Sequence, residues 1–285
     1  MDAYSFVHQY DSNNPHILAY VELNQTDYPY TYDDNGNITE GPHFADTAYL
    51  GTRSFEYNAD NMPTRITTAD DTVDFVYDGS GIRVKKVVNG SDTTYYVGGH
   101  YEIEADGTPT KYIFAGNMRI AMMKGSTIYR LHKDHLGSTI AITDTNGAVV
   151  ESADYLPYGG DTQPPGITLT NYKYTDQEFD PETALYNYVA RLYDPVIGRF
   201  MTPDSIVPNP YDPQSLNRYA YARNNPLYYT DPSGQSFFGI DLLIGAAIGA
   251  AIGGTTSAVT GGDIFEGMLT GAIVGWILRC SRRHH

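Results

Sequence analysis

Cysteine, tryptophan and positive charge are all scarce in this sequence. The 285 residues include one cysteine and one tryptophan, and 18 lysines and arginines stand against 34 aspartates and glutamates, for a formal net charge of −16 at pH 7. Because Cys280 has no second cysteine to pair with, an intramolecular disulfide framework is excluded. A surface this acidic repels phosphate backbones, so we expect no nucleic-acid partner.

A leader segment is also missing from the start of the chain. No basic stretch followed by an apolar run opens the sequence, and such a run is what marks a secretion signal. The sequence instead starts in what reads as the middle of a repeat. We therefore expect it to be the terminal piece of a longer polypeptide, with export by another route as the alternative.

Tyrosine, glycine and proline are abundant, with 26, 28 and 16 copies, which favours many short β-strands joined by turns. Between residues 15 and 88 a weak unit recurs, in which two aromatic residues at positions i and i+2 are followed by Asp or Asn and a turn. Its key tyrosines, Tyr32, Tyr57 and Tyr77, lie 25 and 20 residues apart, which is the scale of stacked supersecondary units. Because side chains two apart share one face of a strand, we predict an all-β sheet of repeated hairpins.

Two short patterns resemble metal ligands but have simpler explanations. Residues 33–37 are rich in Asp and Asn, yet the spacing and terminal glutamate of an EF-type calcium loop are missing, so a hairpin turn is the prediction. His132 and His135 would lie on opposite faces of a strand. We therefore predict no metal and no cofactor. Residues 161–170, DTQPPGITLT, are the predicted internal loop.

The stretch from residue 180 to residue 234 carries the most information. It follows the patterns ARxYDPxxGRFxxxD, NxYxYxxNNP and DPxG. The positions that carry these patterns are Arg191, Tyr193, Asp194, Pro195, Gly198, Arg199, Phe200, Asp204, Asn217, Tyr219, Tyr221, Asn224, Asn225, Pro226, Asp231, Pro232 and Gly234. Over about 50 residues this closely resembles the RHS-repeat-associated core domain of bacterial RHS/YD-repeat proteins, and the earlier tyrosine unit resembles the YD repeat.

The local structure of residues 185–192 is open from pattern alone. Leu185, Val189 and Leu192 fit one face of a helix, and residues 180–182 suit a helix start. Strict alternation along the same residues fits a strand equally well. The resemblance to the RHS family favours the strand.

After Gly234 the composition changes to Gly and Ala. Two series, Gly245, Gly249 and Gly253 and then Gly267, Gly271 and Gly275, have the four-residue spacing of small-residue helix contacts. We predict a Gly-zipper α-helical hairpin over residues 236–285 that associates with membranes, which liposome co-sedimentation would test. The alternatives are a hairpin buried inside a protein shell and a disordered tail.

The resemblance also implies chemistry. Asp204 and Asp231 would form an aspartic-protease-like pair, assisted by Arg191, and would cut the chain between Gln235 and Ser236. Taken by themselves, the four residues from Asp231 to Gly234 predict an ordinary turn. Two positions depart from many relatives: residues 204–207 read DSIV where a second DPxG box is common, and Gln235 stands where a large apolar residue is common.

These observations give one reading of the whole chain. We expect a YD-repeat β-sheet region at residues 1–160, a self-cleaving RHS core at residues 161–235 and the helical tail at residues 236–285. The resemblance implies the C-terminal module of a secreted or cell-surface bacterial toxin, which forms part of a protective shell and releases its own C-terminal peptide, with an immunity or delivery protein as a further partner. The alternatives are a non-cleaving adhesive cell-envelope protein, whose tyrosine faces would bind carbohydrate, and an orphan fragment of a longer RHS protein.

Overall fold

The computed structural model describes residues 6–45, 48–162, 166–205, 211, 213–235 and 238–239. Its main feature is one antiparallel sheet in which strands β4 to β16 pair strictly in chain order. We call this sheet the wall. Its strands are β4 (Thr31–Tyr32), β5 (Ile38–Ala45), β6 (Ala48–Tyr57), β7 (Pro63–Thr67), β8 (Thr72–Tyr77), β9 (Arg83–Val88), β10 (Asp92–Val97), β11 (Tyr101–Ile103), β12 (Pro109–Ala115), β13 (Met118–Lys124), β14 (Thr127–Lys133), β15 (Thr139–Thr143) and β16 (Val149–Ser152).

Within the described part of the chain, three smaller sheets accompany the wall. At the N-terminal end of the wall lie β1 (Val7–Tyr10), β2 (Leu18–Leu23) and β3 (Thr26–Pro29); after the wall come β17 (Glu178–Asp180), β18 (Leu185–Asn187), β19 (Leu192–Asp194) and β20 (Arg199–Phe200), then β21 (Tyr229–Thr230) and β22 (Phe238–Gly239). The helical elements are α1 (Pro213–Leu216) and the 3-10 turns η1 (Gly98–His100), η2 (Tyr174–Asp176) and η3 (Ala222–Asn224). Among the described residues, no helix is long and apolar enough to span a bilayer.

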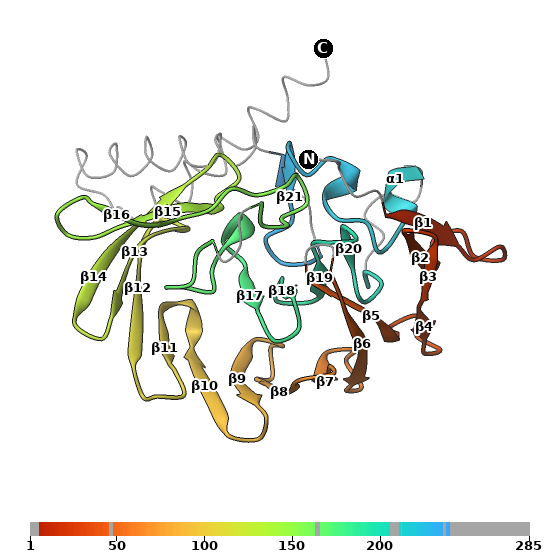
Figure 1. Cartoon of the computed structure of the whole chain (residues 1–285), viewed down its shortest axis with the longest axis horizontal. Helices are drawn as coiled ribbons and strands as arrows, with labels where there is room; N and C mark the ends of the chain where they lie inside the picture. The colour runs from red at the N-terminus through yellow and green to blue at the C-terminus, as the bar shows by residue number, and fades with distance from the viewer. Residues whose placement is uncertain are drawn as a thin grey trace, which may run out of the picture.

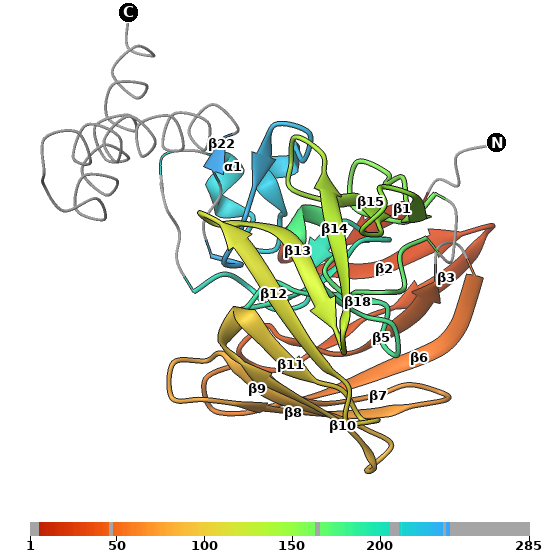
Figure 2. The same ribbon diagram turned by 90° about the vertical axis from the view of Figure 1, so that its left-hand side faces the viewer.

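The wall curls around the segment that follows it. Figure 1 shows strands β5 to β16 as an arc with β17 to β20 inside it, and the view turned by 90° also places β18 within the curve (Figure 2). We call residues 174–235 the closing segment. The all-β, curled antiparallel arrangement predicted from the sequence is therefore confirmed, whereas the predicted hairpin at residues 236–285 lies almost wholly outside the described residues.

The repeat tyrosines connect each strand to an earlier one: Tyr57 and Tyr77 reach the strand paired with their own, and Tyr32 reaches β2 outside the wall. Tyr32, Tyr57 and Tyr77 each donate a 2.8 Å hydrogen bond from the phenol to a backbone carbonyl 14 to 19 residues earlier. Phe55 and Phe75, two residues before two of these tyrosines, are buried in the core. The prediction that the paired aromatics share one face of a strand is confirmed. That face points into the core, so these tyrosines do not form an exposed surface.

The turn after each repeat tyrosine is built by a side chain. Asp33 Oδ1 accepts hydrogen bonds from the backbone N–H groups of Asn35 and Asn37, at 3.0 and 2.8 Å, and it stands between β4 and β5. Asp78 and Asn58 make the same pair of bonds, to the second and fourth residues after them. Residues 33–37 are thus the predicted hairpin turn, with the Asp carboxylate engaged by the backbone.

Residues 185–192 form two strands instead of one. The chain follows β18 to Asn187, turns, and returns as β19 from Leu192. Val189 has a φ of +64°, and its N–H donates to Asn187 Oδ1 at 3.1 Å. The predicted strand conformation is correct at both ends, but the alternating pattern did not reveal this left-handed turn, which a β-branched residue rarely adopts.

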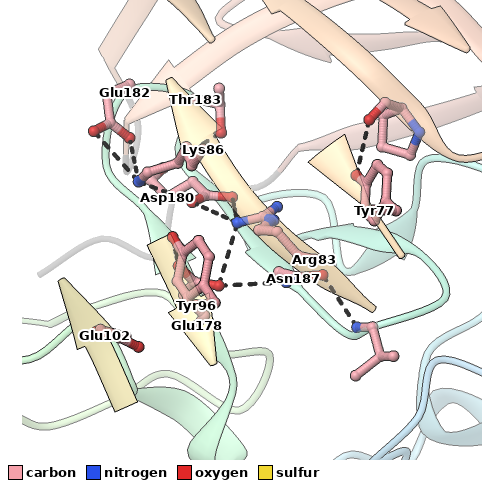
Figure 3. A network of polar contacts seen from close by, with 12 residues as sticks. Tyr77, Arg83, Lys86, Tyr96, Glu102, Glu178, Asp180, Glu182, Thr183 and Asn187 are labelled. Carbon is pink, nitrogen blue, oxygen red and sulfur yellow. Dashed lines mark hydrogen bonds and ion pairs between the residues drawn. The ribbon is translucent and has the colours of Figure 1, made fainter. Parts of the chain in front are cut away.

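Charged side chains tie the wall to the closing segment. Arg83 of β9 lies 3.2 Å from Glu178 and 2.9 Å from Asp180, and Lys86 lies 3.1 Å from Asp180 and 3.2 Å from Glu182. Figure 3 shows these cations on the wall pointing toward carboxylates of the closing segment. Since buried charges are tolerated only when paired, this network fixes which part of the wall faces β17.

Candidate functional site

Arg191 brings the predicted site residues together. Its Nη2 atom lies 3.2 Å from Asp204 Oδ2 and 3.3 Å from Asp231 Oδ2. Arg191 comes from the turn between β18 and β19, Asp204 follows β20, and Asp231 follows β21. All three residues are buried. The structure therefore collects three side chains that span 40 residues of sequence around a single guanidinium nitrogen.

The remaining contacts of Arg191 hold its guanidinium in one plane. Nη1 donates to the carbonyl oxygen of Arg218 at 2.9 Å, and Nε donates to the carbonyl oxygen of Gly234. The guanidinium carbon lies 3.7 Å from the centre of the Phe200 ring. These hydrogen bonds and the contact with the Phe200 ring fix the orientation of the planar guanidinium. A lysine ammonium at the same position could not make the same set of contacts.

The electrostatics of the site are set by burial and by unequal charge. Burial lowers the pKa of Arg191, and Asp204 and Asp231 act in the opposite direction. One cation serves two carboxylates, so the fully ionised trio carries an excess negative charge.

Asp231 also builds the turn that ends the closing segment. Its Oδ1 atom accepts the backbone N–H groups of Ser233 and Gln235 at 3.3 and 3.2 Å, the same pair of bonds that Asp33 makes in the wall. Asp231 thus has one oxygen in the turn and the other toward Arg191. The turn predicted from four residues is present, and it coexists with the contact that the resemblance implied.

Gly234 allows this turn to approach β18 and β19 closely. Its φ is +72°, and a Cβ atom placed there would lie 2.6 Å from the carbonyl oxygen of Tyr188. In the same region the N–H of Ala190 donates to the carbonyl oxygen of Ser233 at 3.2 Å. The backbone at Gly234 therefore lies directly against the hairpin that carries Arg191.

The predicted cleavage position lies at the edge of the described residues. Gln235 is described, and its side-chain amide donates to Ser205 Oγ at 3.5 Å, but Ser236 lies outside the described residues. The carbonyl that Arg191 contacts belongs to Gly234, one residue before the bond predicted to be cut. Arg191 therefore positions the residue next to that bond.

Sequence reasoning assigned no role to three residues that support this site. Asp204 and Arg218 exchange hydrogen bonds through their backbones and the Arg218 side chain, at 2.9 and 2.5 Å, and Gln177 donates to the carbonyl oxygen of Pro232 at 3.2 Å. Phe200 lies under the guanidinium of Arg191. Phe200 belongs to the GRF motif, which was a usable signal. Arg218 occupies a variable position of the second pattern and Gln177 lies before the first pattern, so neither gave a signal.

The two histidines considered as metal ligands lie in different surroundings. His132 on β14 contacts Thr143 Oγ1 through Nε2 at 3.0 Å, and His135 lies in the turn after β14, so the expected arrangement on opposite faces of one strand is not what separates them. Within the described part of the chain, no group of three or more His, Cys, Asp or Glu side chains is placed to hold a metal ion.

Comparison with known proteins finds one matching family model and several similar chains. Residues 107–227 match the Teneurin YD-shell family model. Over 217 residues the chain is 30% identical to the tRNA3(Ser)-specific nuclease WapA of Bacillus spizizenii, covering 72% of this chain and 9% of the relative. Over 281 residues it is 32% identical to Salivary gland surface protein 1 of Aedes aegypti, covering 86% of this chain and 8% of the relative.

A solved structure shares the fold. The structure of the Photorhabdus luminescens Tc holotoxin pore matches 73% of this chain and 13% of the solved chain, with a TM-score of 0.56 and 19% identity. At that identity the likeness concerns the fold alone. The chain spans less than a tenth of the length of the two curated relatives.

Proposed function

Since this chain belongs to the RHS/YD-repeat family, we propose that it is the shell-forming, self-cleaving module of a secreted or surface-exposed toxin-like protein. In this proposal the wall shelters a C-terminal peptide, and the closing segment releases that peptide by cutting after Gln235. The observation that carries the proposal is Arg191, which joins Asp204, Asp231 and the Gly234 carbonyl at the boundary of the tail.

The proposed step is hydrolysis of the peptide bond between Gln235 and Ser236. One carboxylate of the Asp204–Asp231 pair removes a proton from water, and the other donates a proton to the scissile carbonyl. The tetrahedral carbon then expels the Ser236 amine, which takes up a proton. The products are a carboxylate at Gln235 and a free amino group at Ser236, so no external reactant besides water is consumed.

Covalent attachment of the substrate makes a modest catalyst sufficient. The bond to be cut belongs to the same chain, only a few residues after Asp231, so no binding entropy is lost when it enters the site. The reaction is then a single turnover, and we expect no activity on other proteins. The secreted or surface location follows from the family in the same proposal, as does an immunity or delivery protein as a partner.

A second candidate is a non-cleaving shell in which the same residues act as a structural clamp. The observation in its favour is that the carbonyl held by Arg191 belongs to Gly234 and not to Gln235. In this reading Arg191 locks the closing turn onto the β18–β19 hairpin, and the two aspartates serve only to neutralise it.

Intact-mass spectrometry of freshly expressed protein separates the two candidates. Self-cleavage predicts a fragment ending at Gln235, which Asp204→Asn or Asp231→Asn should slow by about a hundredfold or more because the shared proton is lost. Asn58 accepts the same two turn hydrogen bonds as Asp231 does, so the Asn variants should keep the fold. Arg191→Ala should also slow cleavage.

The matched control is Asp78→Asn, which changes an aspartate in an equivalent wall turn and should cut at the wild-type rate. Acid-labile Asp-Pro bonds after Asp180, Asp194, Asp212 and Asp231 can mimic cleavage, so the cut must be mapped. Cuts only at those bonds, or a fresh protein that stays intact, would overturn the self-cleavage proposal and leave the clamp.

A further inference from the structure

One part of the wall has an apolar outer face. On β10 to β14 the side chains alternate between the inside and the outside of the curve, and those on the outside form rows in which residues of neighbouring strands stand opposite each other. Val97 and Ile113 of this face are 62% and 45% exposed. We call this face the outer patch; its rows are Val97, Tyr101, Lys111, Met123 and Ile128, then Tyr95, Ile103 and Pro109, and then Ile113, Ala121 and Arg130.

The charged members of the outer patch are both cations, in a chain whose net charge is −16. They are Lys111 and Arg130. Strands β10 to β14 are described throughout and contain two acidic residues, Asp92 and Glu102, and both of these line a cavity on the inner side of the strands. The outer patch therefore combines exposed apolar side chains with positive charge.

The outer face of the preceding strands has a different composition. On β5 to β8, Glu40 stands opposite Ser54, and Glu56, Arg65 and Asp74 form one row across β6, β7 and β8. Three carboxylates and one cation make that face acidic and polar, as expected of a surface in contact with water. Contiguous apolar patches on a soluble protein, by contrast, mark surfaces that bind a partner. The contrast within one sheet therefore assigns an interaction surface to β10 to β14.

The inner side of the same strands already contacts the closing segment (Figure 1). Tyr96 donates to Glu178 Oε1 at 2.5 Å, and Lys133 of β14 lies 2.5 Å from Asp176. The outer patch is therefore the side of these strands that the described residues leave exposed.

We propose that residues 240–278 of this chain dock on the outer patch. This segment is rich in apolar residues, its charged residues are Asp241, Asp263 and Glu266, and the first cation comes after it, at Arg279. An apolar segment with negative charge complements an apolar face with positive charge, and such complementarity fixes the choice of partner. The proposal does not depend on self-cleavage, because the segment is attached to the wall before any cut.

The width of the outer patch suits this segment. Five strands at a spacing of roughly 4.8 Å make a face about 19 Å wide. A helix with its side chains is about 10 Å across, so the two-helix hairpin predicted from the glycine series would cover that width. Docking would remove apolar surface of both the segment and the wall from water, which is the main favourable contribution to such an association.

The experiment uses the single tryptophan of the chain, Trp276, which lies in the proposed segment and reports on that segment alone. Its fluorescence is measured in the full chain, with intact mass confirmed, and with Asp204→Asn as the background if the wild type cuts itself. Docking should shift the emission to shorter wavelength than that of indole in water and protect Trp276 from quenching by acrylamide. Ile113→Glu combined with Ile128→Glu places carboxylates in the contact, so it should raise the acrylamide quenching constant at least about twofold. Lys111→Glu should raise it as well.

Val76→Glu is the matched control, because Val76 is 47% exposed and lies on β8, outside the outer patch; it should leave Trp276 unchanged. Wild-type emission like that of indole in water, or quenching that the Ile113→Glu, Ile128→Glu variant leaves unchanged, would overturn the proposal. A dimer in sedimentation velocity that this variant converts to a monomer, without a change at Trp276, would assign the patch to a second copy and overturn it too. A chain that never cuts itself would count against the proposed function only.

Discussion

At the scale of single residues, Glu102 makes the stability of the protein depend on pH. Its pKa is raised from 4.5 to about 7 by burial and by Glu178, so the folded state binds a proton more tightly than the unfolded state does. The stabilisation that this provides is complete below pH 4.5 and is lost as the pH rises toward 7. A shift of this size corresponds to about 3 kcal/mol.

We therefore predict that Glu102→Gln is close to wild type in stability at pH 5 and more stable at pH 8. The gain should approach ~3 kcal/mol, or a Tm increase of about 6–12 °C for a domain of this size. His43 acts in the opposite direction, because burial lowers its pKa to about 4 and its contribution is lost as the pH falls below 6.5. The quantity to measure is thus the difference in Tm between variant and wild type from pH 5 to pH 8.5. A difference that is constant across this range contradicts the prediction.

At the scale of elements, the Asp-centred turn is the unit that repeats. Asp33 and Asp78 hold wall turns through the second and fourth backbone N–H groups after them, and Asp231 holds the last turn of the closing segment in the same way. The glycine three residues after each of them has a positive φ. What differs is the surroundings: Gly81 has open space where a Cβ would go, whereas Gly234 faces backbone atoms.

This contrast predicts different costs for the same substitution. Gly81→Ala should lower the free energy of unfolding only by the strain of an alanine at positive φ, about 1 kcal/mol. Gly234→Ala adds a 2.6 Å contact with the carbonyl oxygen of Tyr188, which cannot move without shifting the β18–β19 hairpin. We expect its Tm to fall at least twice as far as that of Gly81→Ala, as measured by thermal unfolding. Equal shifts for the two variants would mean that the closing turn is free to move away from the hairpin.

The sequence predicted the strands and turns much better than it predicted the contacts between distant residues. Repeated aromatics and Asp-Gly turns identify hairpins because both are local properties of the backbone. The turn at Val189 was missed because the alternating pattern of its neighbours suits a continuous strand. The grouping of Arg191 with Asp204 and Asp231 came from resemblance alone, and Arg218 was missed because its contribution is made largely through its backbone carbonyl, which no residue type encodes.

At the scale of the whole molecule, the wall and the closing segment are joined by charge pairs between residues far apart in the chain. Arg53 of β6 pairs with Asp194 of β19 and also donates to the carbonyl oxygen of Thr183 at 2.8 Å. Arg119 and Lys133 of the wall both pair with Asp176. Cations on the wall thus face anions on the closing segment, and a register error between the two would leave several buried charges unpaired.

The Arg53–Asp194 pair allows a direct test of that coupling. Both side chains are almost completely buried, at 1% and 0% exposed. Arg53→Met should cost about 3–5 kcal/mol because it leaves Asp194 charged and unpaired. Asp194→Asn keeps the acceptor for the N–H of Val196 but leaves Arg53 unpaired. The double variant should be more stable than the sum of the two single losses predicts, by at least ~2 kcal/mol of interaction free energy.

The matched control is the exposed pair of Arg65 and Asp74, which are 2.6 Å apart and 45% and 34% exposed. Both of these residues lie within the wall, on paired strands β7 and β8, so the same cycle there should give less than about 1 kcal/mol. Chemical unfolding of the four variants in each cycle measures both values. If the buried cycle were additive like the exposed one, charge pairing would not hold the closing segment inside the wall, and the shared apolar core of Leu185, Leu192 and Phe44 would have to align the two parts on its own.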